Sequence, residues 1–269
     1  MKRLLSAVTL ACVCALPVSA VAEAPSPELR AAIDGSWRSE TDKARDVYRH
    51  PAEALTFWGL GPNQTIVEFY PGNGGWWTQI LAPYAKNTGG TYIAAINNGA
   101  DPAFYAAVAD EARYGKVKAY SLTGEVSELP ANTADLVLIA RAFHNWARRD
   151  GVTDHYLKAA FDTLKPGGIL AVEQHRAAEG ADPKAGSGYV PESYVIEAAQ
   201  KAGFVLEGRS EINANPKDTR DHPFGVWTLP PVRSSAARGE QPAPNFDRAK
   251  YDAIGESDRM TLKFRKPLK

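Results

Sequence analysis

Cysteine is almost missing from this chain of 269 residues. The two that occur, Cys12 and Cys14, both lie in an N-terminal segment that we expect to be removed on export. A chain without cysteine has no disulfide bond and no thiol nucleophile. The sequence therefore excludes a disulfide framework and thiol chemistry in the mature protein.

An excess of charge of either sign is missing as well. Lys+Arg and Asp+Glu both number 31, so the formal net charge is zero, and clustered basic residues of the kind that mark a nucleic-acid surface are not seen. Beyond the N-terminal segment, no apolar run is long enough to span a bilayer. The length and a hydrophobic content of 44% suit one sizeable α/β core. We expect one domain with no nucleic-acid partner and no membrane span.

The first 22 residues have the pattern of a secretory signal peptide. Lys2 and Arg3 give a basic start, an apolar run follows, and small residues stand at Ala20 and Ala22. The run is too short and wrongly flanked for a membrane span. We expect cleavage after Ala20 or Ala22 and, in a bacterium, a periplasmic location. A lipoprotein acylated at Cys12 is the alternative, although its apolar run would be very short.

After residue 64, strand-like and helix-like runs alternate, which predicts a parallel sheet with helices on both faces. The apolar runs DLVLIA at 135–140 and GILAV at 168–172 are typical of central strands buried on both faces. The alternating run RMTLKFRKP at 259–267 predicts an edge or antiparallel strand. The expected strands are 65–70, 91–96, 117–120, 135–140, 168–173, 204–211 and 259–267. The expected helices between them are 76–86, 102–114, 153–164 and 191–202.

Three segments fall outside this alternation. Residues 23–44 are polar and rich in small residues, and predict an N-terminal arm with one short helix. Residues 46–60 have apolar residues at helical spacing, with Pro51 expected near the first turn of the second half. Residues 213–258 are long, polar and proline-rich, and connections of that length tend to be functional or disordered. The expected domain therefore covers 45–269 and contains 213–258 as a lid-like insertion.

The stretch IVEFYPGNGGWWTQILAP, Ile66 to Pro83, joins a predicted strand to a helix through a glycine cluster. In an open parallel sheet, ligands bind at the carboxyl ends of the strands, where the strand order reverses. Gly72 and Gly74 let the backbone approach a ligand, and the next helix offers free N–H groups. The glycine spacing is not that of a dinucleotide fingerprint or a phosphate loop. A plain tight turn with packing tryptophans is the alternative.

The segment VEFYPGNGG resembles the first motif of class I S-adenosylmethionine-dependent methyltransferases, in which an acidic residue precedes a glycine loop. LTGEVSELPANTADLVLIA at 122–140 resembles their third and fourth strands, and LKPGGILAVEQHRA at 164–177 resembles their fifth. ARAFHNW, YVPESYVIEAAQKAGF and IGESDRMTLKFRKP resemble an exported bacterial group of predicted methyltransferases. The resemblance implies a Rossmann-like methyltransferase fold, an α/β structure with a mostly parallel seven-stranded sheet, an antiparallel last strand and helices on both faces.

The same resemblance implies that S-adenosylmethionine binds along the glycine loop. Glu125 matches the acidic residue that often contacts the adenine amine. Asn98 stands where an acidic residue usually holds the ribose hydroxyls, and Tyr70 stands where the first glycine is usual. The expected cofactor-binding residues are Glu68, Tyr70, Gly72, Gly74, Asn98, Glu125 and Arg141.

Two histidines follow the fourth and fifth predicted strands. His144 lies beside Asn145 and Trp146, and His175 lies two residues after Glu173. A histidine of near-neutral pKa can take a proton from a nucleophile as a methyl group arrives, while Asn145 orients the acceptor and Trp146 covers a sulfonium cation. We expect His144, Asn145 and His175 at catalytic positions. A hydrogen-bonded structural role is the alternative for each histidine.

Two further alternatives concern the role of the insertion at 213–258 and the presence of a metal site. The insertion is expected to rise above the pocket as a lid, but its Asn, Asp and Pro residues also suit turn capping. No short ligand spacing such as H-x-x-x-H occurs, so no metal site is expected. The residue types that such a site would use are His144, His175, His222, Glu173 and Asp221.

The leading hypothesis is therefore an exported S-adenosylmethionine-dependent methyltransferase that acts on an unidentified small-molecule acceptor. A non-catalytic periplasmic metabolite-binding protein on the same fold is the alternative, because a fold by itself does not settle function.

Overall fold

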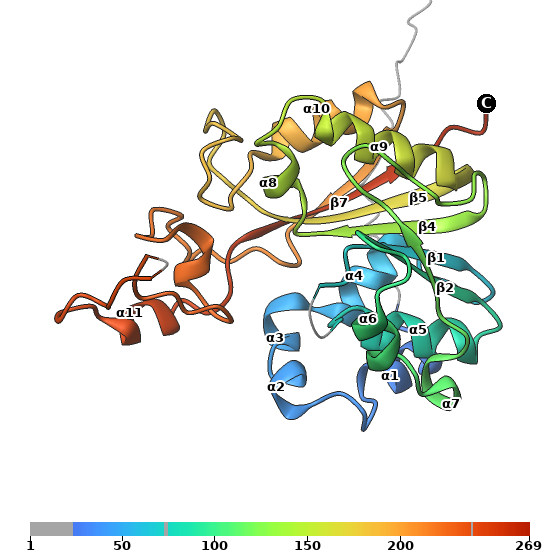
Figure 1. The fold of residues 1–269 in the computed structure, drawn as a ribbon, viewed down its shortest axis with the longest axis horizontal. Helices are drawn as coiled ribbons and strands as arrows, with labels where there is room; N and C mark the ends of the chain where they lie inside the picture. Colours follow the sequence, from blue (N-terminus) through green and yellow to red (C-terminus); the bar gives the residue numbers. More distant parts are fainter. Residues whose placement is uncertain (1–23, 73–74, 238) are drawn as a thin grey trace, which may run out of the picture.

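One seven-stranded sheet organises the computed structural model, which describes residues 24–72, 75–237 and 239–269 (Figure 1). The strand order is β3-β2-β1-β4-β5-β7-β6. β7 is antiparallel to both of its neighbours, and the other pairs are parallel. The expected mostly parallel sheet with an antiparallel last strand is confirmed. The strands are β1 Thr65–Phe69, β2 Thr91–Ile96, β3 Lys118–Ser121, β4 Ala134–Ala140, β5 Leu164–His175, β6 Val205–Ser210 and β7 Arg259–Arg265.

Helices cover both faces of the sheet (Figure 1). On one face lie α8 Phe143–Trp146, α9 Val152–Thr163 and α10 Glu192–Lys201. On the other lie α1 Pro27–Ile33, α4 Pro51–Trp58, α5 Thr78–Asn87, α6 Pro102–Ala107 and α7 Glu111–Tyr114. The remaining short elements are α2 Glu40–Lys43, α3 Asp46–Arg49, the 3-10 turn η1 Gly225–Thr228 and α11 Arg248–Asp252.

Strand β4 shows why the sequence specifies this two-sided core. Leu136 and Leu138 pack into the cluster under α5, whereas Val137 and Ile139 pack into the cluster under α9. Successive side chains of a strand point to opposite faces, so a continuous apolar run fills both cores. Burying each such side chain contributes about 1.5–3 kcal/mol.

Two expected helices are each divided in the structure. The helix expected at 46–60 breaks at His50, whose φ is 40°, because Pro51 begins a new helix and disfavours helical backbone in the residue before it. The helix expected at 102–114 breaks before Asp110, whose side chain accepts from the Arg113 N–H and caps a second helix. A periodic apolar pattern does not reveal these internal caps.

The segment expected to be an arm is packed against the sheet domain. Leu29, Ala32 and Ile33 of α1 are buried against α5, and the Trp37 indole donates to the Gln79 carbonyl over 2.8 Å. The residues up to 22, expected to be a signal peptide, lie outside the described residues. Among the described helices, none has the length and hydropathy that crossing a bilayer requires.

The carboxyl ends of β1, β4 and β5 meet at one edge of the sheet. Strand β5 continues to His175, two residues beyond the expected end, so Glu173 and His175 lie on the same face. Strand β7 begins at this edge, with Arg259 opposite His175. The strand order reverses between β1 and β4, which is where an open α/β sheet binds ligands.

Candidate active site

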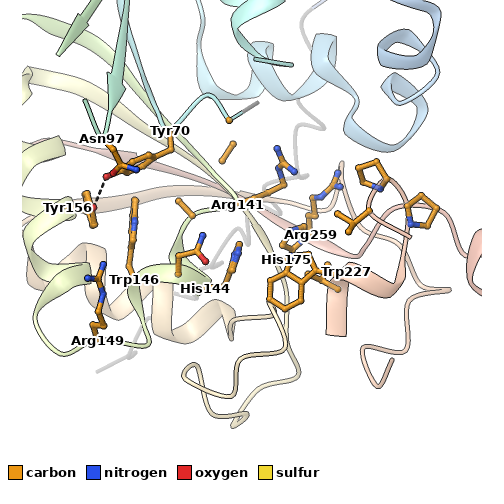
Figure 2. Close-up of a pocket in the computed structure, with 18 residues that line it drawn as sticks. Tyr70, Asn97, Arg141, His144, Trp146, Arg149, Tyr156, His175, Trp227 and Arg259 are labelled. Atoms are coloured by element: carbon orange, nitrogen blue, oxygen red, sulfur yellow. Dashed lines mark hydrogen bonds between the residues drawn. The ribbon is translucent and has the colours of Figure 1, made fainter. Parts of the chain in front are cut away.

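Two adjoining cavities, each of about 480 Å³, open at this edge of the sheet. The first, here called the β4 pocket, lies over the ends of β1, β4 and β5 (Figure 2). The second, here called the β2 pocket, lies over the ends of β1 and β2 and reaches α6. The lining residues that the two pockets share are Tyr70, Gly72 and Asn97.

Tyr70 lies at the boundary between the two pockets and lines both. Its backbone is left-handed, with φ 53°, a conformation that strains a bulky residue. Its hydroxyl donates to the Leu122 carbonyl over 2.6 Å and lies 2.6 Å from the Tyr156 hydroxyl, which holds the ring in place. The methyltransferase motif that this loop resembles has glycine here, and the backbone has a conformation that glycine favours.

The β2 pocket offers groups that suit a nucleoside. Ile96 and Phe104 give it apolar walls, and Asn97 and Asn98 place exposed side-chain amides at its rim. Gly72 has φ 72°, and a Cβ there would meet only the Tyr70 carbonyl, at 4.0 Å, so the backbone is open to a ligand. Asn98 accepts from the Ala100 N–H, which leaves its amide hydrogens for hydroxyl groups.

Two of the expected cofactor residues, Glu68 and Glu125, line neither pocket. Glu68 is buried in β1, where its carboxylate accepts from the Thr78 hydroxyl of α5 and the Tyr92 hydroxyl of β2 over 3.0 and 2.7 Å. Burial raises the pKa of Glu68 to about 7, and this side chain lines neither pocket. Glu125 is exposed in the turn after β3 and also lines neither pocket. Gly74 falls outside the described residues.

His144 is buried in α8, which follows β4, and its pKa is lowered to about 4 because burial disfavours the imidazolium. The Gln174 amide nitrogen lies 3.4 Å from His144 Nδ1 and donates to the Gly188 carbonyl over 3.2 Å. From this network we assign Nδ1 as the acceptor and Nε2 as the protonated nitrogen. His144 therefore offers a neutral hydrogen-bond donor, which corrects the expectation of a base with near-neutral pKa.

His175 also lines the β4 pocket, with its ring centroid 5.7 Å from that of His144. Burial, followed by the charge of Arg259, lowers the pKa of His175 well below its usual value. Its Nδ1 lies 2.5 Å from the Ser257 hydroxyl. Asn145 is exposed at the pocket, and Trp146 is stacked on Tyr156 with ring centroids 4.2 Å apart. The β4 pocket thus brings together all three residues expected at catalytic positions.

Arginines dominate the charge of this pocket, and of these the sequence analysis named only Arg141. Arg141 has a left-handed backbone, with φ 56°, and its N–H donates to the Glu173 carbonyl. Arg259 places Nε 3.1 Å from the Glu173 carboxylate and also pairs with Glu256. Arg149, the third, is exposed at the rim. Arg259 could have been found as the first residue of a strand expected to start at the ligand edge.

The insertion contributes a wall to the β4 pocket, but through residues other than the polar ones expected. Its lining residues are Val226, Trp227, Pro230, Pro231 and Val232. Asp218 instead accepts from Tyr189 and lies 2.8 Å from His222 in a buried network. Among the described residues, no three His, Cys, Asp or Glu side chains are grouped so that they could hold a metal ion.

No known family model matches the chain, and no curated protein matches its sequence. Solved structures do match its fold. The [4+2]-cyclase SpnF is 16% identical with a TM-score of 0.55, over 88% of this chain and 84% of its own. A Galdieria sulphuraria chain assigned as a sarcosine dimethylglycine methyltransferase is 12% identical with a TM-score of 0.55, over 91% and 92%.

A third match comes from the complex between the Haloferax volcanii Trm112 methyltransferase activator and a methyltransferase. It is 16% identical with a TM-score of 0.52, over 91% of this chain and 100% of that one. At these identities the likeness establishes the Rossmann-like methyltransferase fold alone. The same fold carries a cyclase, so the chemistry has to be argued from the two pockets.

Proposed function

We propose that the chain is an S-adenosylmethionine-dependent methyltransferase that acts on a small-molecule acceptor. The observation that carries the proposal is the pair of adjoining pockets at the point where the strand order reverses. Each pocket has the volume of a small-molecule site. A group-transfer enzyme needs two such sites that share a boundary, and Tyr70, Gly72 and Asn97 form that boundary.

The β2 pocket is assigned to the cofactor. Ile96 and Phe104 would pack against the base, and the amides of Asn97 and Asn98 would bind the ribose hydroxyls. Gly72 would let the backbone follow the chain toward the β4 pocket. When bound, the cofactor supplies an electrophilic methyl group on a positively charged sulfur.

The β4 pocket is assigned to the acceptor. Its side chains position the acceptor and exclude water from it, and they do not take a proton from it. With a pKa of about 4, His144 is neutral at pH 5–8 and a weak base. Its Nε2–H and the Asn145 amide can orient the acceptor by hydrogen bonds. Trp146 and Trp227 line the same pocket and exclude water from it.

Calorimetric titration of the protein with S-adenosylmethionine and S-adenosylhomocysteine tests the proposal. We expect both to bind and Gly72→Val to abolish binding, because a side chain there would fill the space left for the ligand. Gly186→Val is the matched control, since Gly186 has φ 79° and open space around it but lies outside both pockets. Failure of both ligands to bind at millimolar concentration would sink the assignment.

A non-catalytic metabolite-binding protein is the second candidate, and the low pKa of both histidines favours it, because neither is a strong base. The SpnF cyclase adds that this fold is not tied to methyl transfer. The two candidates separate in the titration, since a protein that has lost methyl transfer together with its cofactor binds neither ligand.

We propose a periplasmic location for the enzyme. The supporting feature is the basic, then apolar, then small-residue pattern of residues 1–22. N-terminal sequencing of the protein from a periplasmic fraction should begin at Val21 or Glu23. An uncleaved chain recovered from the cytoplasm would contradict this location.

A further inference from the structure

The β4 pocket has positive side chains in its wall and no negative ones. Arg141, Arg149 and Arg259 line it, and no Asp or Glu is among its described lining residues. Burial keeps both lining histidines neutral by lowering their pKa values. The wall therefore presents cationic and neutral hydrogen-bond donors to whatever the pocket holds.

Neither Arg141 nor Arg149 of this wall forms an ion pair with a described residue, but Arg149 is exposed to water at the rim and Arg141 is not. The buried Nε of Arg141 has no hydrogen-bond partner, and its guanidinium forms no ion pair with any described residue. Burial lowers the pKa of Arg141, and the nearby charge of Glu173, which acts in the opposite direction, does not offset it. The residue as a whole is partly exposed to the cavity. A guanidinium with a buried nitrogen is normally paired, so an unpaired one that lines a cavity indicates a missing anion.

Among the described residues, the buried carboxylates next to the pocket wall form no ion pair with Arg141. Glu173 and Glu256 are the carboxylates of the buried cluster, and Arg259 pairs with both. Glu256 also pairs with Arg45 and Arg49, over 2.6 and 3.0 Å. Both terminal nitrogens of Arg49 are buried without a hydrogen-bond partner. Four guanidinium groups thus face two carboxylates, and Figure 2 shows Arg141 and Arg259 reaching the same part of the pocket.

We propose that the β4 pocket binds the anionic group, a carboxylate or a phosphate, of an acceptor with an apolar body. This rests on the proposed function for the identity of the pocket as the acceptor site. The anion would sit at Arg141, where the planar guanidinium can bind it with two parallel hydrogen bonds. The apolar body would lie against Trp146, Trp227 and Pro230.

The same charge predicts coupling between the two ligands. S-adenosylmethionine carries a sulfonium cation, which an uncompensated arginine wall repels. An anion at Arg141 removes that repulsion, so it should raise the affinity for S-adenosylmethionine. It should leave S-adenosylhomocysteine, which has no sulfonium, nearly unaffected.

Inorganic phosphate is a probe for this site that needs no known acceptor. In calorimetry of the full chain at low ionic strength, we expect Arg141→Gln to weaken phosphate binding by about tenfold or more, because a charge-assisted hydrogen bond is lost. Arg141→Lys should recover part of the affinity. Arg265→Gln is the control, since Arg265 pairs with Glu207 outside both pockets, and we expect less than about a twofold change there. Unchanged phosphate binding in Arg141→Gln, or no binding to the wild type, would overturn the proposal.

S-adenosylhomocysteine and 5′-methylthioadenosine distinguish whether the anion at Arg141 belongs to the acceptor or to the cofactor. If the anion belongs to the acceptor, phosphate binds equally well with and without saturating S-adenosylhomocysteine. Arg141→Gln then leaves the affinity for S-adenosylhomocysteine unchanged. If S-adenosylhomocysteine displaces phosphate while 5′-methylthioadenosine, which lacks the carboxylate, does not, Arg141 holds the cofactor and the proposal is overturned.

The outcomes also separate this inference from the proposed function. Phosphate binding that depends on Arg141, in a protein that binds neither cofactor form, would reject the methyltransferase assignment and keep the anion site. Cofactor binding with no phosphate binding would keep the methyltransferase assignment and reject the anion site.

Discussion

The carboxyl group of Glu68 lies beneath α5 with two hydroxyl donors, from Thr78 and Tyr92. Its folded pKa of about 7 lies above the ordinary 4.5, so the folded state holds the proton more tightly. The resulting stability is complete below pH 4.5 and is lost as the pH rises through 7.

Glu68→Gln should remove this pH dependence. An amide keeps an oxygen acceptor for both hydroxyls and does not titrate. We expect the unfolding free energy of the wild type to fall by roughly 3 kcal/mol relative to the variant between pH 4.5 and 8. Urea titrations at several pH values measure the difference, and parallel pH profiles of the two proteins would contradict the assignment.

His144 gives the opposite dependence. Its folded pKa of about 4 lies below the ordinary 6.5, so the unfolded chain binds the proton first and stability is lost as the pH falls from 6.5 to 4. The unfolding free energy of the wild type should fall by roughly 3 kcal/mol over this pH range, and His144→Gln should remove that fall. The measurement is the difference in unfolding free energy between wild type and variant at pH 7 and pH 4.5. A difference that does not change with pH would refute the neutral, buried imidazole.

At the scale of elements, the contact between the loop after β5 and η1 fixes one wall of the β4 pocket. The Val226 N–H donates to the Ser187 carbonyl over 2.8 Å, and a Cβ on Gly225 would lie 2.1 Å from that carbonyl oxygen. A substitution at Gly225 must therefore push η1, with Trp227, away from the loop.

Gly225→Ala should lower the unfolding free energy by about 2 kcal/mol or more relative to Gly180→Ala, the matched control. Both glycines have a positive φ, but nothing lies within 4 Å of a Cβ on Gly180, so that change carries only the backbone strain, about 1–2 kcal/mol. Phosphate affinity should fall only in Gly225→Ala. Chemical denaturation and calorimetry report the two effects, and equal behaviour of the variants would show that η1 does not shape the pocket.

The elements that the sequence predicted well are those defined by local patterns. All seven strands lie within a few residues of their expected bounds, because apolar runs such as 135–140 fill both cores. The carboxyl ends of parallel strands must share an edge, so His144 and His175 could be placed together. The arginine network and the Trp227 wall escaped prediction because they depend on packing between distant segments. Local pattern also cannot show that Glu68 is covered by α5 while Glu125 stays exposed.

At the scale of the whole molecule, a buried ion-pair network joins α3 to β7. Glu256 pairs with Arg45 and Arg49 near the first helices and with Arg259 at the start of the last strand. Glu256→Gln would leave the buried Arg49 and Arg259 and the partly exposed Arg45 with less negative charge. Loss of one partner in a buried ion-pair network costs about 3–5 kcal/mol.

Glu207→Gln is the control for this prediction. Glu207 pairs with Lys263 and Arg265 at a more exposed position, where an ion pair contributes about 0–1 kcal/mol. Urea denaturation of both variants at pH 7 measures the contrast. A loss below about 1 kcal/mol in Glu256→Gln would show that the network does not hold these elements together.

The place of β7 in the sheet has a consequence for the order of assembly. β7 comes last in the chain, yet it lies between β5 and β6 and supplies the strand pairing of β6. Until residues 259–265 have been synthesised, β6 has no strand to join and β5 keeps an open edge. Ribosome-bound chains that stop short of β7 should therefore stay sensitive to protease around 164–210, and protection should appear only when the final strand is released.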